Sequence, residues 1–113
     1  MITVVELPEY IRKSERVLDE EERDNLMEHI ARNPRTGALV TGTGGVRKMR
    51  WARKGMGKSG GVRIIYFFYN ENIPVFLLTA FGKNEKTNLT KAECNELAKL
   101  TTLLVKSYKR GDK

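Results

Sequence analysis

The chemically most informative stretch of the chain covers residues 45–63, where seven basic residues occur without an acidic one. Side chains alternate between the two faces of a strand, so a strand here points Lys48 and Arg50 to one face and Met49 to the other. If the glycine-rich residues 54–61 fold the chain back, Arg63 lies beside Lys48 and Arg50. Lysine and arginine bind phosphate through charge-assisted hydrogen bonds. These residues therefore predict a cationic site for a phosphate group.

Such a site suits RNA cleavage, because RNA carries its own nucleophile. The 2′-hydroxyl attacks the adjacent phosphorus once it loses its proton, and fixed cations stabilise the charge of the transition state. Neighbouring cations disfavour the ammonium form of a lysine, so Lys48 is the candidate general base. Arg50 and Arg63 would hold the phosphate, and Lys83 would add charge or protonate the leaving 5′-oxygen. The expected products are a 2′,3′-cyclic phosphate or 3′-phosphate and a 5′-hydroxyl.

Further residues around this cluster are candidates for contacts with the rest of an RNA strand. Glycines would let the connecting loop approach an RNA backbone, and the segment after the third long strand brings polar groups to the sheet edge. The candidates are Arg47, Arg53, Lys54, Lys58, Asn84 and Lys86. The alternative is a solvated basic face beside an ordinary hairpin loop. That alternative leaves the repulsion between opposed like charges in a sheet without compensation.

Charge is unevenly spread along the chain. The formal net charge is +7, yet residues 1–31 contain nine acidic residues against four basic ones. The excess of bases therefore lies entirely in the remainder. A basic surface on a small domain is typical of proteins that bind nucleic acid. The alternative is a basic surface that only aids solubility.

Composition also bears on metals, disulfides and membranes. One cysteine, Cys94, and one histidine, His29, are too few for a disulfide or a zinc site, so we expect no metal and no cofactor. The longest apolar stretch, residues 64–69, is far shorter than the roughly 20 residues of a membrane span, and the first residues lack a secretory pattern. We expect one soluble cytoplasmic domain over residues 1–113, without a membrane partner.

The elements that position the cluster follow from periodicity and capping signals. Asp19 with Glu22, like Thr90 with Glu93, forms the capping-box pattern of a helix start. The glycine-rich residues 37–45 are expected to be a loop. We predict strands over residues 3–6, 46–52, 62–69 and 75–81 and helices over residues 8–17, about 20–32 and about 91–108. The last helix carries the apolar stripe Leu97, Leu100, Leu104 and Tyr108. The order β-α-α-β-β-β-α predicts an α+β fold with helices packed against a small antiparallel sheet.

Three spaced motifs resemble the RelE/HigB family of toxins, and most closely its HigB branch. They are TGGVRKMR at residues 43–50, GGVRIIY at residues 60–66 and LTAFGKNE at residues 78–85. The predicted order of elements also matches that family. The resemblance extends from about residue 33 to residue 100, and three motifs in the right order are more specific than any one alone.

The resemblance implies a RelE-like fold and a toxin of a type II toxin-antitoxin system. It implies cleavage of mRNA, usually in the A site of the 30S ribosomal subunit, and inhibition by a HigA-like antitoxin encoded alongside. By the same resemblance Lys48 and Arg50 surround the scissile phosphate, Arg63 binds it, and Lys83 follows the last strand. The sequence departs from the RelE pattern where Asn84 replaces a common arginine and where residues 86–90 contain no tyrosine. The general acid therefore stays open.

Two other classes of protein are compatible with this architecture. One is a ParE-like toxin that inhibits DNA gyrase by protein binding and needs no catalytic cluster, which the convergence of Lys48, Arg50 and Arg63 argues against. The other is a non-catalytic RNA-binding protein, which would bind RNA with a steep salt dependence and leave it intact.

Overall fold

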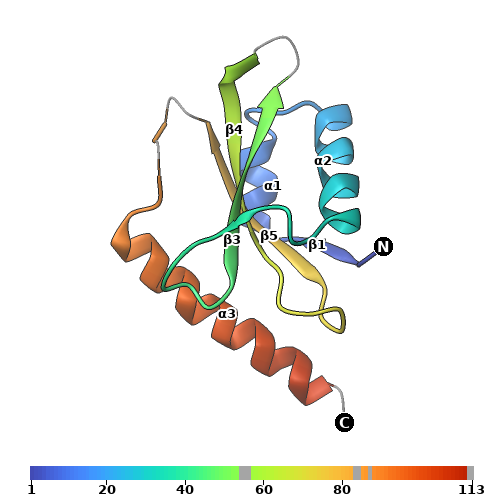
Figure 1. Ribbon diagram of the computed structural model, residues 1–113, viewed down its shortest axis with the longest axis vertical. Coiled ribbons are helices and arrows are strands. Elements are labelled where there is room, and N and C mark those ends of the chain that lie inside the picture. Colours follow the sequence, from blue (N-terminus) through green and yellow to red (C-terminus); the bar gives the residue numbers. More distant parts are fainter. Residues whose placement is uncertain (54–56, 83–84, 87, 112–113) are drawn as a thin grey trace.

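The computed structural model describes residues 1–53, 57–82, 85–86 and 88–111; for residues 53, 57–60 and 110–111 only the backbone is described. Three helices and five strands follow one another along these residues (Figure 1). They are β1 (Val4–Glu6), α1 (Pro8–Ser14), α2 (Glu20–Arg32), β2 (Ala38–Leu39), β3 (Val46–Arg53), β4 (Gly57–Phe67), β5 (Val75–Gly82) and α3 (Lys91–Gly111). The α+β fold class predicted from the sequence is confirmed.

The strands form one sheet in the order β1-β5-β4-β3-β2. Strands β2 to β5 pair antiparallel, whereas β1 lies parallel to β5. The sheet is therefore mixed: the predicted antiparallel pairing is present in β2 to β5, and the edge strand β1 departs from it. The chain reaches β5 from β1 only after α1, α2 and three strands, and this long-range pairing has no local signal in the sequence.

The helices cover the two faces of the sheet unequally. Helices α1 and α2 pack on one face, where Leu26 and Ile30 of α2 meet Ile64 of β4 in a buried cluster. Helix α3 crosses the other face, where its stripe Leu97, Leu100, Leu104 and Tyr108 packs against a second cluster. In Figure 1, α3 runs obliquely across the lower part of the sheet, and the β3–β4 hairpin extends beyond it. The far half of that face is therefore left to the side chains of β3 and β4.

Both predicted capping boxes are confirmed. Asp19 accepts from the Glu22 amide at 2.7 Å, and Glu22 accepts from the Asp19 amide at 2.9 Å. Thr90 accepts from the Glu93 amide at 3.1 Å, and Glu93 accepts from the Thr90 amide at 2.8 Å. These reciprocal bonds satisfy amides that a helix start leaves without partners, so α2 and α3 begin where local chemistry dictates.

Some boundaries differ from the sequence predictions. Helix α1 ends at Ser14, three residues before the expected end, and β4 begins at Gly57, five residues before the expected start. The glycines at positions 57, 60 and 61 belong to β4, in which Gly57 pairs with Arg53 and the register shifts before the Trp51–Val62 pair. Residues 38–39, predicted as loop, form the short strand β2 opposite Arg47 and Lys48.

Strand β2 is held in place by the segment before it. Tyr66, fully buried in β4, donates its hydroxyl to the Pro34 carbonyl at 2.9 Å and accepts from the Gly37 amide at 2.8 Å. Arg47 donates through Nη1 to the carbonyls of Arg35, at 3.0 Å, and Gly37, at 2.8 Å. A Cβ on Gly37 would lie 2.8 Å from the Tyr66 hydroxyl, so glycine is required for this approach. Burial raises the pKa of the Tyr66 hydroxyl, which therefore stays protonated and able to donate.

Replacing Tyr66 with phenylalanine should lower the free energy of unfolding by about 1–3 kcal/mol, because buried polar groups of residues 34 and 37 lose their partner. Equilibrium urea denaturation measures the change. Tyr69→Phe is the matched control, since Tyr69 is 42% exposed and should give a change within about 0.5 kcal/mol. Equal stability of Tyr66→Phe and wild type would show that the hydroxyl does not hold this segment.

Candidate active site

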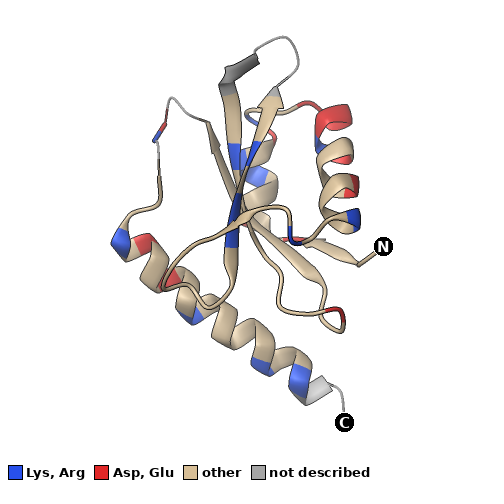
Figure 2. Ribbon diagram, viewed as in Figure 1, with Lys and Arg blue, Asp and Glu red and all other residues tan. Residues whose placement is uncertain are grey.

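Three of the predicted site residues come together on the α3 face of the sheet. Arg50 of β3 lies directly opposite Arg63 of β4, and Lys48 lies one alternation further along β3, opposite Ile65. Directly opposed residues of an antiparallel pair share a face, with Cβ atoms about 4.5–5.5 Å apart. Figure 2 shows basic positions on adjacent stretches of β3 and β4. The juxtaposition of Lys48, Arg50 and Arg63 expected from the sequence is therefore confirmed.

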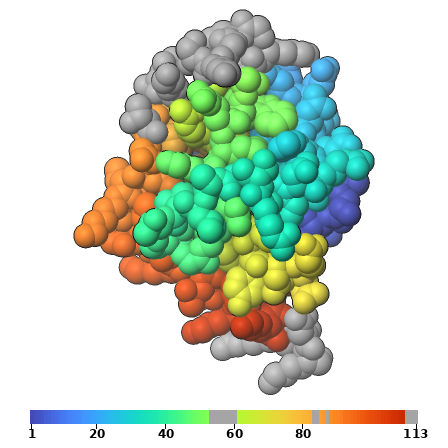
Figure 3. Space-filling view, in the orientation of Figure 1, coloured from blue at the N-terminus to red at the C-terminus, as the bar shows by residue number. Residues whose placement is uncertain are grey.

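These three side chains surround a hollow of about 320 Å³. It is lined by Ala38, Lys48, Met49, Arg50 and Arg63, with no carboxylate among them. Ala38 of strand β2 lines one side of the hollow, and its side chain is small. Atoms of β3, green in Figure 3, reach the surface beside the teal segment that carries β2. An anion that binds in the hollow would therefore meet three positively charged side chains on one open surface.

Arg63 is unusual among the three. Its Nη1 is buried, and in the described part of the chain it has no hydrogen-bond partner. A buried donor of a charged group costs free energy when it lacks an acceptor. Across residues 1–53, 57–82, 85–86 and 88–111, no ion pair involves Lys48, Arg50 or Arg63. An anionic oxygen bound in the hollow would relieve the repulsion between Arg50 and Arg63.

Lys48 has one partner that sequence reasoning missed. Its Nζ donates to Oδ1 of Asn88 at 3.3 Å, and the same oxygen accepts from the Leu89 amide at 2.9 Å. Asn88 precedes α3 and is 40 positions from Lys48 along the chain. The contact depends on the way α3 returns to the sheet, so no local pattern indicates it. A neutral amide holds the lysine without adding a negative charge to the hollow.

The residues expected to extend RNA binding are distributed differently. Arg47 lies on the opposite face from the cluster, where its Nη1 donates to the backbone carbonyls of Arg35 and Gly37. Lys86 contacts Glu93 and lies 4.9 Å over the ring of Phe81, the cross-strand neighbour of Arg63. Lys54, Lys83 and Asn84 lie outside the described residues, as do the side chains of Arg53 and Lys58.

Glu93 links the segment before α3 to the helix itself. Its hydrogen bond from Lys86 is the main cause that lowers the pKa of its carboxyl, and the Thr90 amide contributes to the same shift. Glu93 therefore stays ionised while it caps α3. The capping box and the Lys86 contact together fix the start of α3, and with it the segment that carries Asn88.

A model of one known family matches this chain. The family is described as the RelE toxin of the RelE/RelB toxin-antitoxin system, and the match covers residues 10–111. The chain belongs to the RelE toxin family. The match includes all of β3, β4 and β5, so the hollow lies within the RelE domain. The resemblance of the sequence motifs to the RelE family is therefore confirmed, and the description of that family pairs the toxin with an antitoxin.

Among the described residues, no three His, Cys, Asp or Glu side chains gather closely enough to bind a metal ion. Of the helices that the structure describes, none is both long and apolar enough to span a membrane.

Proposed function

We propose that this RelE-family toxin is a metal-independent endoribonuclease that cleaves mRNA. The observation that carries the proposal is the hollow bounded by Lys48, Arg50 and Arg63, with a buried arginine nitrogen that lacks an acceptor in the described structure. Preorganised cations stabilise the charge that develops on a phosphodiester in its transition state, and they need little reorganisation. The sheet fixes the backbone positions of these three residues before RNA arrives.

In the proposed reaction, Lys48 removes the proton from the 2′-hydroxyl, whose oxygen attacks the adjacent phosphorus. Arg50 and Arg63 hold the non-bridging oxygens while the bond to the 5′-oxygen breaks. A proton passes to that oxygen, and Lys83 is the candidate donor. The products are a 2′,3′-cyclic phosphate, or a 3′-phosphate after its hydrolysis, and a 5′-hydroxyl. Arg53, Lys54, Lys58 and Asn84 are proposed to bind flanking nucleotides.

The proposal extends to the setting of the reaction. We place the toxin in the HigB branch, acting in the cytoplasm on mRNA in the A site of the 30S subunit and inhibited by a HigA-like antitoxin. The three sequence motifs support the branch, and the open basic face supports contact with ribosome-bound RNA.

Mapping RNA ends after brief induction tests the proposed reaction. We expect new 5′-hydroxyl ends inside open reading frames, detected by primer extension, and 2′,3′-cyclic phosphates upstream of them. Inhibition of gyrase supercoiling without new RNA ends would instead indicate a ParE-like toxin. RNA binding without cleavage would indicate a non-catalytic binder.

Asn88→Ala should lower the cleavage rate about threefold to tenfold, because Lys48 loses the hydrogen bond that positions its Nζ at the hollow. Single-turnover cleavage of an RNA substrate, with ribosomes where cleavage needs them, measures the effect. Asn72→Ala serves as the control, since Asn72 is exposed in the turn between β4 and β5 and does not line the hollow. Equal rates for Asn88→Ala and wild type would mean that Lys48 needs no such support.

A further inference from the structure

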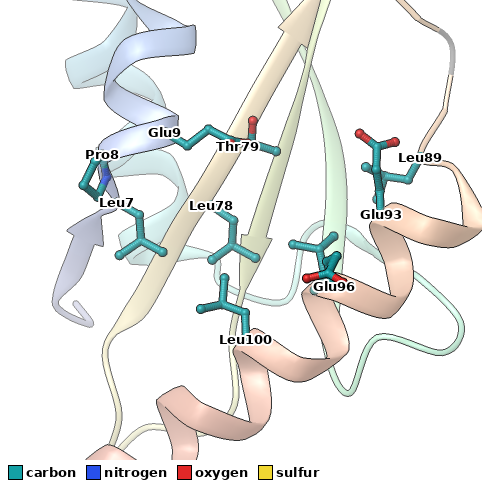
Figure 4. Close-up of a pocket in the computed structure, with 10 residues that line it drawn as sticks. Leu7, Pro8, Glu9, Leu78, Thr79, Leu89, Glu93, Glu96 and Leu100 are labelled. Carbon is teal, nitrogen blue, oxygen red and sulfur yellow. The ribbon is translucent and has the colours of Figure 1, made fainter.

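A second feature of the surface is an apolar groove of about 410 Å³ between the start of α1, strand β5 and the first half of α3 (Figure 4). Its floor consists of the leucines Leu7, Leu78, Leu89, Leu97 and Leu100. Leu78 is buried, and the other four are only partly buried. Covering such side chains yields about 25 cal/mol per Å² of apolar surface removed from water. A partner with apolar side chains would therefore gain free energy here.

The rim of the groove is acidic, although the chain as a whole is basic. Glu9, Glu93 and Glu96 line it, and no Lys or Arg is among the described residues that do so. Glu93 is held by the capping box and Lys86, whereas Glu9 is exposed and Glu96 makes only a surface pair with Lys99 at 3.4 Å. An acidic rim repels the phosphates of RNA. It favours a partner that carries Lys or Arg beside its apolar side chains.

The groove is separate from the cationic hollow but leads towards it. A smaller hollow of about 340 Å³ shares Glu9, Thr79 and Glu93 with the groove and reaches Phe81 and Lys86. Phe81 lies directly opposite Arg63 in the sheet. A segment seated in the groove therefore lies next to the loop between β5 and α3, whose far end holds Lys48 through Asn88.

We propose that this groove is the docking site of the antitoxin, which inserts an amphipathic segment with large aliphatic side chains on the leucines and basic side chains beside Glu9 and Glu96. The inference deepens the proposed function by naming the surface through which the toxin is regulated. The toxin-antitoxin description of the matching family supplies the partner, and the apolar floor with its acidic rim supplies the chemistry that recognises it.

Charge reversal at the rim tests the proposal without threatening the fold, because Glu9 and Glu96 are exposed. The probe is the purified product of the gene encoded beside the toxin gene. Its binding is measured by calorimetry on Arg63→Ala protein, so that the result does not depend on nuclease activity. The E9K/E96K variant should bind at least about tenfold more weakly at low ionic strength, and the difference should shrink as salt is added. Leu100→Ala should also weaken binding, since it removes apolar contact from the floor.

E20K/E28K on α2 is the matched control. Glu20, like Glu9, lies in the first turn of a helix, and Glu28, like Glu96, makes an exposed pair within its own helix. The control changes the net charge equally and should bind like the parent protein. In the active protein, E9K/E96K should cleave RNA at the wild-type rate when no antitoxin is present.

Three results would overturn the assignment of the groove. The first is unchanged binding by both E9K/E96K and Leu100→Ala, and the second is equal weakening by the α2 control. The third is failure of the wild-type surface to bind the neighbouring gene product at all. A change in the toxin's own self-association in place of antitoxin binding would assign the groove to a second copy of the chain. None of these results bears on whether the hollow cleaves RNA.

Discussion

An Arg63→Ala variant should cleave RNA about a hundredfold to a thousandfold more slowly than wild type and should no longer arrest growth. Arg63 lines the hollow, and its buried Nη1 has no hydrogen-bond partner in the described structure. Lys48 and Arg50 cannot replace it, because neither lies on β4. Single-turnover cleavage and growth after induction measure the two effects.

The control for Arg63→Ala removes the same charge elsewhere. Arg12 is exposed on α1, on the sheet face opposite to the hollow, so Arg12→Ala should keep the wild-type rate. A further variant, Arg63→Met, keeps the length of the side chain and removes the charge that faces Arg50. It should unfold at the same or a higher urea concentration than wild type, because opposed like charges destabilise a sheet. Rapid cleavage by folded Arg63→Ala would remove Arg63 from the site.

The combination of lost activity and retained stability is what separates a functional cluster from a solvated face. In a solvated face, Arg50 and Arg63 would be two exposed charges, and their removal would change little. In an anion site, the same two charges cost stability in the free protein and are compensated only when a phosphate is bound. Measuring the cleavage rate and the free energy of unfolding on the same variants therefore distinguishes an anion site from a solvated face.

Elements with local causes were predicted closely from the sequence. Helix α2 has the predicted bounds, because the Asp19–Glu22 capping box starts it and the Asn33–Pro34 pair ends it. Helix α3 starts at Lys91 for the same kind of reason. Features with long-range causes were not predicted, namely strand β2 and the parallel pairing of the predicted strand β1 with β5. Strand β2 exists because Tyr66 and Arg47 hold residues 34–37 against the sheet, and β1 joins β5 only after the chain has crossed back.

The candidate site divides in the same way. Lys48 and Arg50 share a face by strict alternation within β3, and Arg63 could be added because a hairpin register places it opposite one of them. Arg47 was a candidate for RNA contacts, and alternation within β3 places it on the face opposite to Lys48 and Arg50. Asn88 could not be found, since a contact over 40 positions depends on the packing of α3.

Lys48→Arg decides whether Lys48 transfers a proton or only supplies charge. Arginine keeps the positive charge and most of the reach, but its guanidinium does not give up a proton under assay conditions. If Lys48 is the general base, Lys48→Arg should lose about as much activity as Lys48→Ala, a factor of roughly 10²–10⁴ in the cleavage step. Arg50→Lys provides the matched exchange one alternation away, and it should keep much of the rate because the role proposed for Arg50 requires only a cation beside the phosphate.

The cleavage rates are compared in single-turnover assays at several pH values, after urea denaturation has shown that all three variants fold. Retention of near wild-type cleavage by Lys48→Arg would assign Lys48 to phosphate binding and move the search for the base to another group at the hollow.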